Sequence, residues 1–229
     1  MPANRQVNIN TESVDNYLKA ILALSGSEDR AVSSTALAQR LGVAPASITN
    51  MLQKLASVSK PYVEYEKHRG VRLSAEGKRR ALEILRHHRL LETFLYEILD
   101  YPIEEVHEEA ERLEHFISER FEERISAKLG HPKFDPHGHC IPAMDGRMPK
   151  QISRPVTSLE EGGKFVVDSV SDEDAPLLKG LKAHGIAPGV PIQITRRNSG
   201  EFALHAVGAP RPLVLSRAHA EAIRIRDRD

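Results

Sequence analysis

The chain has 229 residues, of which 40% are hydrophobic and 28% are charged, and its formal net charge is zero. That length allows one large domain or two to three small ones, and no stretch approaches the roughly 18 apolar residues that span a bilayer. The first residues, MPANRQVNINTES, lack the apolar core of a secretory signal, and the single cysteine, Cys140, excludes an internal disulfide framework. We therefore expect a cytoplasmic protein that does not associate with a membrane.

The first hundred residues begin with a pattern that predicts three helices. Residues 11–27 carry apolar side chains at helical spacing. A short helix capped by Ser33 or Ser34 ends at Gly42, and a second starts at Pro45 and runs to about residue 56. This is a helix–turn–helix pattern. Its core is expected to contain Leu37, Leu41, Val43, Ile48 and Leu52, and its exposed reading positions are Ala46, Ser47, Thr49 and Asn50.

A β-hairpin is predicted directly after these helices. The segment YVEYEKHRGVRLS, residues 62–74, alternates β-type and polar residues around a turn at 68–70. A helix–turn–helix followed by a hairpin with a basic tip is typical of a winged helix that binds DNA. We expect Lys67 and Arg69 at the tip to contact the phosphate backbone.

Charge is distributed unevenly over the two long helices predicted next, at 75–99 and 103–129. Residues 60–86 hold eight Lys/Arg against four Glu, whereas residues 92–123 hold twelve Asp/Glu against two Arg. The asymmetry indicates a basic contact surface beside an acidic site that needs cations. Solvated helix faces are the alternative explanation for the same pattern.

Metal-ligand side chains gather on one face of the second of these helices. His107, Glu111, Glu114 and His115 fall within an arc of roughly 100° at helical spacing. His88 and Glu92, four residues apart, form a second pair on the preceding helix. Carboxylate and imidazole without thiolate suits Mn²⁺, Fe²⁺, Co²⁺ or Zn²⁺. An exposed acidic helix with incidental histidines remains the alternative.

The remainder of the chain divides into a linker and a small β-barrel. Residues 130–155 are rich in Pro, Gly and His without a clear period, and their histidines lack the paired spacing of a zinc site, so a turn is favoured there. Strand-like segments at 164–171 and 190–207, a turn at 198–200 and a short helix that ends at Gly185 predict the barrel.

The segment HRLLETFLYEILDYPIEEVHEEAERLEH, which follows the winged helix, resembles the diphtheria toxin repressor family of metal-dependent transcriptional regulators. The PHGHCIP segment at 136–142 is similar to that family as well. The resemblance implies an α+β chain of three domains. These are a winged helix–turn–helix (1–75), a helical metal-binding and dimerisation domain (76–150) and an SH3-like, FeoA-type β-barrel (151–229). It also implies a homodimer that binds a palindromic DNA operator when loaded with Fe²⁺ or Mn²⁺.

The family's metal sites map onto particular residues of this sequence. His88, Glu92 and His107 match the ancillary site of the longer members, which Asp174 or Glu173 of the barrel would close. Glu111, Glu114 and His115 match the primary site, and Glu111 stands where manganese-responsive members have glutamate and iron-responsive members have cysteine. Asn16 stands where a methionine or aspartate ligand is expected and can offer a carbonyl oxygen. Lys19 replaces a glutamate ligand of the short manganese regulators.

Together these features predict a repressor that senses Mn(II), with Fe(II) as the alternative and Co(II) or Zn(II) as substitutes in vitro. Metal would favour one spacing of the two recognition helices in the dimer, so that metal and DNA binding are coupled. Two other classes stay open, a carboxylate-bridged di-metal enzyme and a metal-independent DNA-binding regulator whose barrel binds a small molecule or partner. The expected dimer surface includes Leu90, Phe94, Leu95, Leu113 and Phe116.

Overall fold

The computed structural model describes residues 11–26, 29–158, 164–196 and 200–227. The chain forms two compact units, each described here by itself. Unit 1 contains residues 1–86 with 144–146, and unit 2 contains residues 87–143 with 147–229. The long helix α4, Ala75–Leu99, begins in unit 1 and ends in unit 2. The predicted boundaries at 75/76 and 150/151 stay a prediction.

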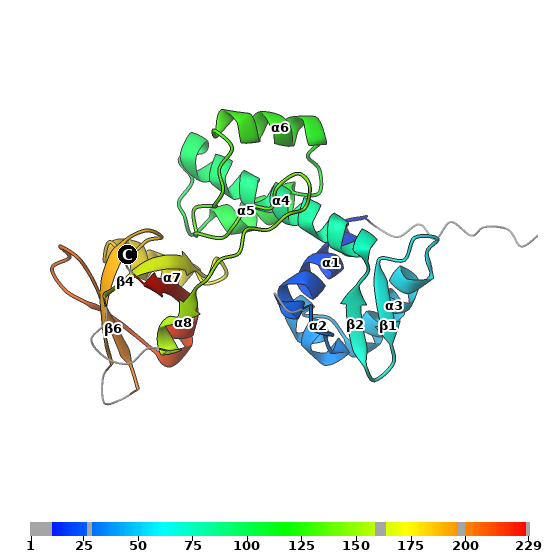
Figure 1. Cartoon of the computed structure of the whole chain (residues 1–229), viewed down its shortest axis with the longest axis horizontal. Coiled ribbons are helices and arrows are strands. Elements are labelled where there is room, and N and C mark those ends of the chain that lie inside the picture. Colours follow the sequence, from blue (N-terminus) through cyan, green and yellow to red (C-terminus); the bar gives the residue numbers. More distant parts are fainter. Residues whose placement is uncertain (1–10, 27–28, 159–163, 197–199, 228–229) are drawn as a thin grey trace, which may run out of the picture. The chain divides into compact units, whose positions relative to one another are not determined.

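Unit 1 is a winged helix–turn–helix (Figure 1). It contains α1 (Thr11–Ser25), α2 (Ser34–Leu41), α3 (Pro45–Ser57), β1 (Val63–Glu66), β2 (Gly70–Leu73) and the first part of α4. The Ser33 side chain caps α2 by accepting from the Ala36 amide, and Gly42 ends α2 in the left-handed region with φ 63°. The strands β1 and β2 pair antiparallel, and Val32 adds a short bridge to Val71. The predicted helices and hairpin are therefore confirmed.

The core of unit 1 joins α1 to the helix–turn–helix. Leu18, Ile21, Leu37, Ile48 and Leu52 have no exposed surface. The prediction that Val43 belongs to this core is wrong, because its side chain is 37% exposed after the turn that ends α2. An ion pair also crosses unit 1, in which the partly exposed Arg80 of α4 donates to both carboxylate oxygens of the buried Asp15, each at 2.8 Å.

The helical part of unit 2 contains a break that the sequence pattern did not predict. Instead of one helix over 103–129, α5 (Val106–Leu113) and α6 (Glu119–Lys128) are separated by a turn. Ser118 starts α6 because its backbone is extended and its side chain accepts from the Phe121 amide. The single long helix is therefore a wrong prediction.

The apolar side chains of these helices divide between a core and a surface. The helical core of unit 2 consists of Leu90, Leu91, Leu95, Val106, Ala110, Ile125 and Ile141. Leu90 and Leu95 are 0% and 3% exposed, so their prediction as dimer-surface residues is wrong. Phe116, at 78% exposed, and Leu113, at 36%, remain available for a partner.

The predicted linker at 130–155 is folded onto unit 2 over part of its length. Phe134 and Cys140 form an isolated bridge around a turn, and Asp135, His137 and Ile141 are buried. The expected turn is present. The prediction of a linker is wrong for this part of the chain, because these buried side chains pack into unit 2.

The C-terminal part of unit 2 is a six-stranded antiparallel sheet with the order β3-β8-β4-β5-β6-β7 (Figure 1). Its elements are β3 (Arg154–Pro155), a 3-10 turn η1 (Val156–Ser158), β4 (Lys164–Val170), α7 (Ala175–Ala183), β5 (Pro191–Arg196), β6 (Phe202–Ala206), β7 (Leu213–Leu215), α8 (Arg217–Glu221) and β8 (Ile223–Asp227). The turn predicted at 198–200 falls largely outside the described residues. Among the described residues no helix is long and apolar enough to cross a membrane.

Candidate metal centre

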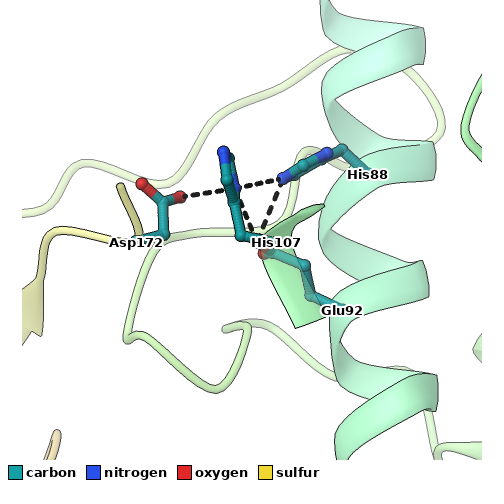
Figure 2. A group of neighbouring side chains, drawn as sticks. All are labelled: His88, Glu92, His107 and Asp172. Atoms are coloured by element: carbon teal, nitrogen blue, oxygen red, sulfur yellow. Dashed lines mark hydrogen bonds and ion pairs between the residues drawn. The ribbon is translucent and has the colours of Figure 1, made fainter. Parts of the chain in front are cut away.

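Two predicted ligands come from one face of α4, and α5 brings a third to them. His88 Nε2 lies 3.0 Å from Glu92 Oε1 and 3.1 Å from His107 Nδ1. His107 Nδ1 lies 3.2 Å from the same Glu92 oxygen. Figure 2 shows the three side chains converging, with His107 between His88 and Asp172. The predicted grouping of His88, Glu92 and His107 is present in unit 2.

The fourth member of this group is Asp172, which follows the end of β4. Its Oδ2 atom lies 3.7 Å from His107 Nδ1 (Figure 2). The predicted ligand Asp174 lies elsewhere, because its side chain caps α7 by accepting from the Leu177 amide and pairs with His219. Glu173 is absent from the group as well. Of these three neighbouring acidic residues, Asp172 is the one that joins the group, and the role of Asp174 or Glu173 as a ligand stays a prediction.

A loop from the supposed linker adds two further side chains, Asp135 and His137. His137 Nε2 lies 3.1 Å from the Ile103 carbonyl oxygen, which can only accept, so the ring proton is on Nε2. His137 Nδ1 then presents a lone pair toward Glu92 Oε1 at 3.7 Å. We call His88, Glu92, His107, Asp135, His137 and Asp172 the Glu92 cluster.

Backbone contacts hold this loop against β4. The His137 carbonyl accepts from the Val170 amide at 2.9 Å. At Gly138, with φ 87°, an added Cβ would lie 2.2 Å from the Asp168 carbonyl oxygen, so only glycine fits. Asp168 itself stands where the pairing of β4 with β8 shifts register. From the other side, Arg89 of α4 pairs with Asp135 and donates to the Cys140 carbonyl.

Burial and charge make the Glu92 cluster favourable for cations. Glu92 has no exposed surface; burial raises its pKa, but His88, His107 and His137 outweigh burial and hold that pKa well below its usual range. Burial also raises the pKa of Asp172, and His139 and His107 lower it by more. The carboxylates of Glu92 and Asp172 thus face imidazoles at a site where Glu92, His88 and His137 are buried and His107 and Asp172 are partly exposed. Electrostatic interactions are stronger where water is excluded.

Several atoms of the Glu92 cluster are suited to a bound ion. Within the described residues, Glu92 Oε2, Asp135 Oδ2 and His137 Nδ1 are buried and make no hydrogen bond. Asp135 Oδ2 lies 3.5 Å from the Arg89 guanidinium. Buried polar atoms normally have a hydrogen-bond partner, so Glu92 Oε2 and His137 Nδ1 fit coordination to a metal. The donors are oxygen and imidazole nitrogen, which suit Mn²⁺, Fe²⁺ or Zn²⁺.

The predicted primary-site residues, Glu111 in α5 and Glu114 and His115 in the turn after it, lie next to this cluster. His88 Nδ1 is 2.7 Å from Glu114 Oε2 and 3.7 Å from Glu111 Oε1, and His115 Nε2 is 3.3 Å from Glu114 Oε1. Glu111, Glu114 and His88 therefore form a second candidate group with His115 beside it. Asn16 belongs to α1 in unit 1, where its Oδ1 atom is buried without a hydrogen bond among the described residues. Its role as a ligand stays a prediction.

The predicted DNA-reading residues lie on α3 and on the turn between β1 and β2. Ala46, Ser47 and Asn50 are exposed, Thr49 is half-buried, and Lys67 and Arg69 are exposed at the hairpin tip. Arg69 pairs with Glu66 at 3.0 Å. These positions are available to a ligand, and their contacts with DNA stay a prediction.

Family models cover most of the chain. The N-terminal DNA-binding domain of the iron dependent repressor matches residues 10–71, and the metal binding and dimerisation domain of the same repressor matches residues 74–143. A FeoA domain matches residues 154–227.

Relatives and solved structures agree with these models. The transcriptional regulator MntR of Oceanobacillus iheyensis is 36% identical over 125 residues, 55% of this chain and 82% of that protein. The iron-dependent repressor IdeR of Mycobacterium tuberculosis H37Rv is 26% identical over 204 residues, 82% of this chain and 86% of that protein. The structure of a manganese-dependent transcriptional repressor in complex with manganese is 34% identical, with a TM-score of 0.83 over 93% of this chain and 99% of that one.

The chain therefore belongs to the iron-dependent repressor family of metal-dependent transcriptional regulators. It is a DNA-binding regulator rather than a di-metal enzyme, and it carries a dimerisation domain and an SH3-like FeoA domain. The predicted family and fold class are confirmed, and so is the predicted function at the level of a metal-dependent, DNA-binding transcriptional regulator.

Proposed function

We propose that this regulator is a homodimer that responds to Mn(II) and binds palindromic operators in the cytoplasm, where it represses genes of metal uptake or homeostasis. The observation that carries the choice of metal is the oxygen and nitrogen donor set of the Glu92 cluster and of Glu111, Glu114 and His115, which contains no sulfur. Carboxylate oxygens suit Mn²⁺, whereas thiolates select softer metals. The relatives named as manganese-dependent support the same choice.

Two groups of side chains would hold the metal. His88, Glu92, His107 and Asp172 would form one site, with Asp135 and His137 within reach of its shared carboxylate. Glu111, Glu114 and His115 would form the other, and Asn16 is predicted to add a carbonyl oxygen. When bound, a divalent ion supplies positive charge that offsets the repulsion between these carboxylates.

The protein's own residues would transmit this change of charge. Glu92 and His88 are fixed on α4, and Asp172 is fixed by the contact of β4 with the loop at Gly138. Drawing these side chains together would order the helical domain and favour one spacing of the recognition helices, which must fit half-sites about 34 Å apart. Coupling between metal and DNA binding of about 1–3 kcal/mol per protomer would be typical.

Fluorescence anisotropy tests this proposal. A labelled operator, selected from random DNA with metal-loaded protein, is titrated with protein in chelator and in Mn²⁺, anaerobic Fe²⁺, Co²⁺ or Zn²⁺. We expect binding only with metal, strongest with Mn²⁺, and a shift toward Fe²⁺ in Glu111→Cys. Equal binding in chelator would instead favour a metal-independent regulator, and strongest binding of the native chain with Fe²⁺ would favour the iron-responsive alternative.

A further inference from the structure

A third group of ligand-type side chains lies apart from both groups above. His87 of α4 faces the first turn of α6, where its Nε2 atom is 3.0 Å from Glu122 Oε2 and 4.0 Å from Glu119 Oε1. The side chains of His87 and Glu122 are 5% and 4% exposed, whereas that of Glu119 is 68% exposed. We call these three residues the His87 group.

The backbone determines which nitrogen of His87 carries a proton. His87 Nδ1 lies 3.2 Å from the Glu114 carbonyl oxygen, which can only accept, so Nδ1 donates to it. In the neutral ring, Nε2 then carries no proton and presents a lone pair. Among the described residues this buried Nε2 makes no hydrogen bond, although Glu122 lies within hydrogen-bonding distance. A lone pair facing a carboxylate oxygen is repulsive unless a positive charge lies between them.

The His87 group has the composition and spacing of a three-ligand metal site. Metal–nitrogen and metal–oxygen bonds of about 2.0–2.2 Å place neighbouring ligand atoms about 3–3.5 Å apart, and the contact between His87 and Glu122 is 3.0 Å. The three ligand atoms all lie within 4.8 Å of one another. The exposed Glu119 leaves a side open to solvent, through which an ion can enter and water can complete its coordination.

We propose that the His87 group binds one divalent transition-metal ion, such as Zn²⁺, at a site separate from the two proposed above. The ion would join the start of α6 to α4, at the point where the chain turns after α5.

Crystals of the full-length protein grown with Zn²⁺ would test this site by anomalous diffraction at the zinc edge. We expect a peak between His87 Nε2 and Glu122 in the native protein and in Glu123→Gln, whose exposed side chain lies on the same helix. The peak should vanish in Glu122→Gln, while a peak at the Glu92 cluster stays. Because the sites give separate peaks, failure here is distinct from failure of the proposed function.

Isothermal titration with Zn²⁺ gives a second measurement that does not depend on crystals. The His87→Gln variant should bind one Zn²⁺ ion fewer per chain than the Glu123→Gln variant. A native protein that binds zinc at the Glu92 cluster and none at His87 would overturn the proposal, as would equal stoichiometry in the two variants. In either case His87 would be a protonated partner of Glu122 and not a ligand.

Discussion

The DNA-reading surface and the Glu92 cluster use polar side chains in different ways. On α3 and the hairpin tip these side chains are mostly exposed, and Arg69 is 80% exposed. In the Glu92 cluster, Glu92 and His137 have no exposed surface and each contacts other charged or polar groups. Exposed side chains such as those of the DNA-reading surface each contribute a weak interaction, and the loss of one changes binding little. In a buried polar network such as the Glu92 cluster, the loss of one side chain leaves its partners unsatisfied.

The sharpest way to break the buried set is Glu92→Gln, because His88, His107 and His137 all lie within 3.7 Å of one oxygen of Glu92. We expect Mn²⁺ affinity to fall on the order of 100-fold or more, measured by isothermal titration. Glu97→Gln, exposed on the same helix, is the matched control. Unchanged affinity in Glu92→Gln would place the metal elsewhere.

Unit 1 has a partly buried polar pair of its own, between Arg80 and Asp15. Arg80→Ala leaves Asp15 buried at 2% exposure without this bidentate partner and should lower the free energy of unfolding of unit 1 by about 3 kcal/mol. Urea denaturation followed by circular dichroism measures it. Arg79→Ala, whose side chain is 62% exposed, should change stability far less. Equal effects of the two variants would contradict the argument.

The backbone contact behind Asp172 can be tested at glycines. Gly138→Ala and Gly130→Ala both place a side chain at positive φ, but only Gly138 meets backbone, while Gly130 faces open space. We expect Gly130→Ala to cost about 1 kcal/mol and Gly138→Ala about 2 kcal/mol more, with weaker Mn²⁺ binding in Gly138→Ala alone. Thermal unfolding with and without Mn²⁺ separates the two. Equal losses of stability in Gly138→Ala and Gly130→Ala would mean that the loop can shift to accept a side chain at Gly138.

Protons compete with metal at the Glu92 cluster. Burial lowers the pKa of His137, and Glu92 and Asp135 raise it by more, so the net pKa is raised. In the metal-free protein this ring contributes stability below its ordinary pKa of about 6.5, and the contribution is lost as pH rises through the raised pKa. Metal requires the neutral ring, so Mn²⁺ affinity should increase from pH 6 to 8 with proton release. Titration in buffers of different ionisation enthalpy measures that release, and pH-independent binding would contradict it.

The smallest effect is expected on the exposed set. Lys67→Ala and Arg69→Ala should each weaken operator binding a few-fold and reduce the slope of log affinity against log salt by about 0.9. Asn50→Ala should instead weaken binding to the operator more than binding to random DNA. Anisotropy at several salt concentrations tells these apart. An unchanged salt slope would show that the hairpin tip does not contact phosphate.

Local patterns predicted the helices of unit 1, the long helix α4 and the grouping of His88, Glu92 and His107, whereas residues brought together by longer-range contacts were missed. His88 and Glu92 are visible from the sequence because four residues make one helical turn. The break before α6 was hidden, since the ligand spacing of α5 continues into the turn at Glu114 and His115 and only the cap at Ser118 marks the new helix. Asp135, His137 and Asp172 come from loops, where no periodicity relates a residue to a partner far along the chain.

His88 connects the two proposed sites through a single imidazole ring. Its Nε2 faces Glu92 and His107, and its Nδ1 lies 2.7 Å from Glu114. A neutral ring carries one proton, so a ring that offers Nε2 to a cation must donate from Nδ1 to Glu114. That donation would fix one carboxylate oxygen of Glu114 and leave the other facing His115. A cation held by Nε2 in the Glu92 cluster would therefore change what His88 offers to Glu114, and one imidazole ring would couple the two proposed sites.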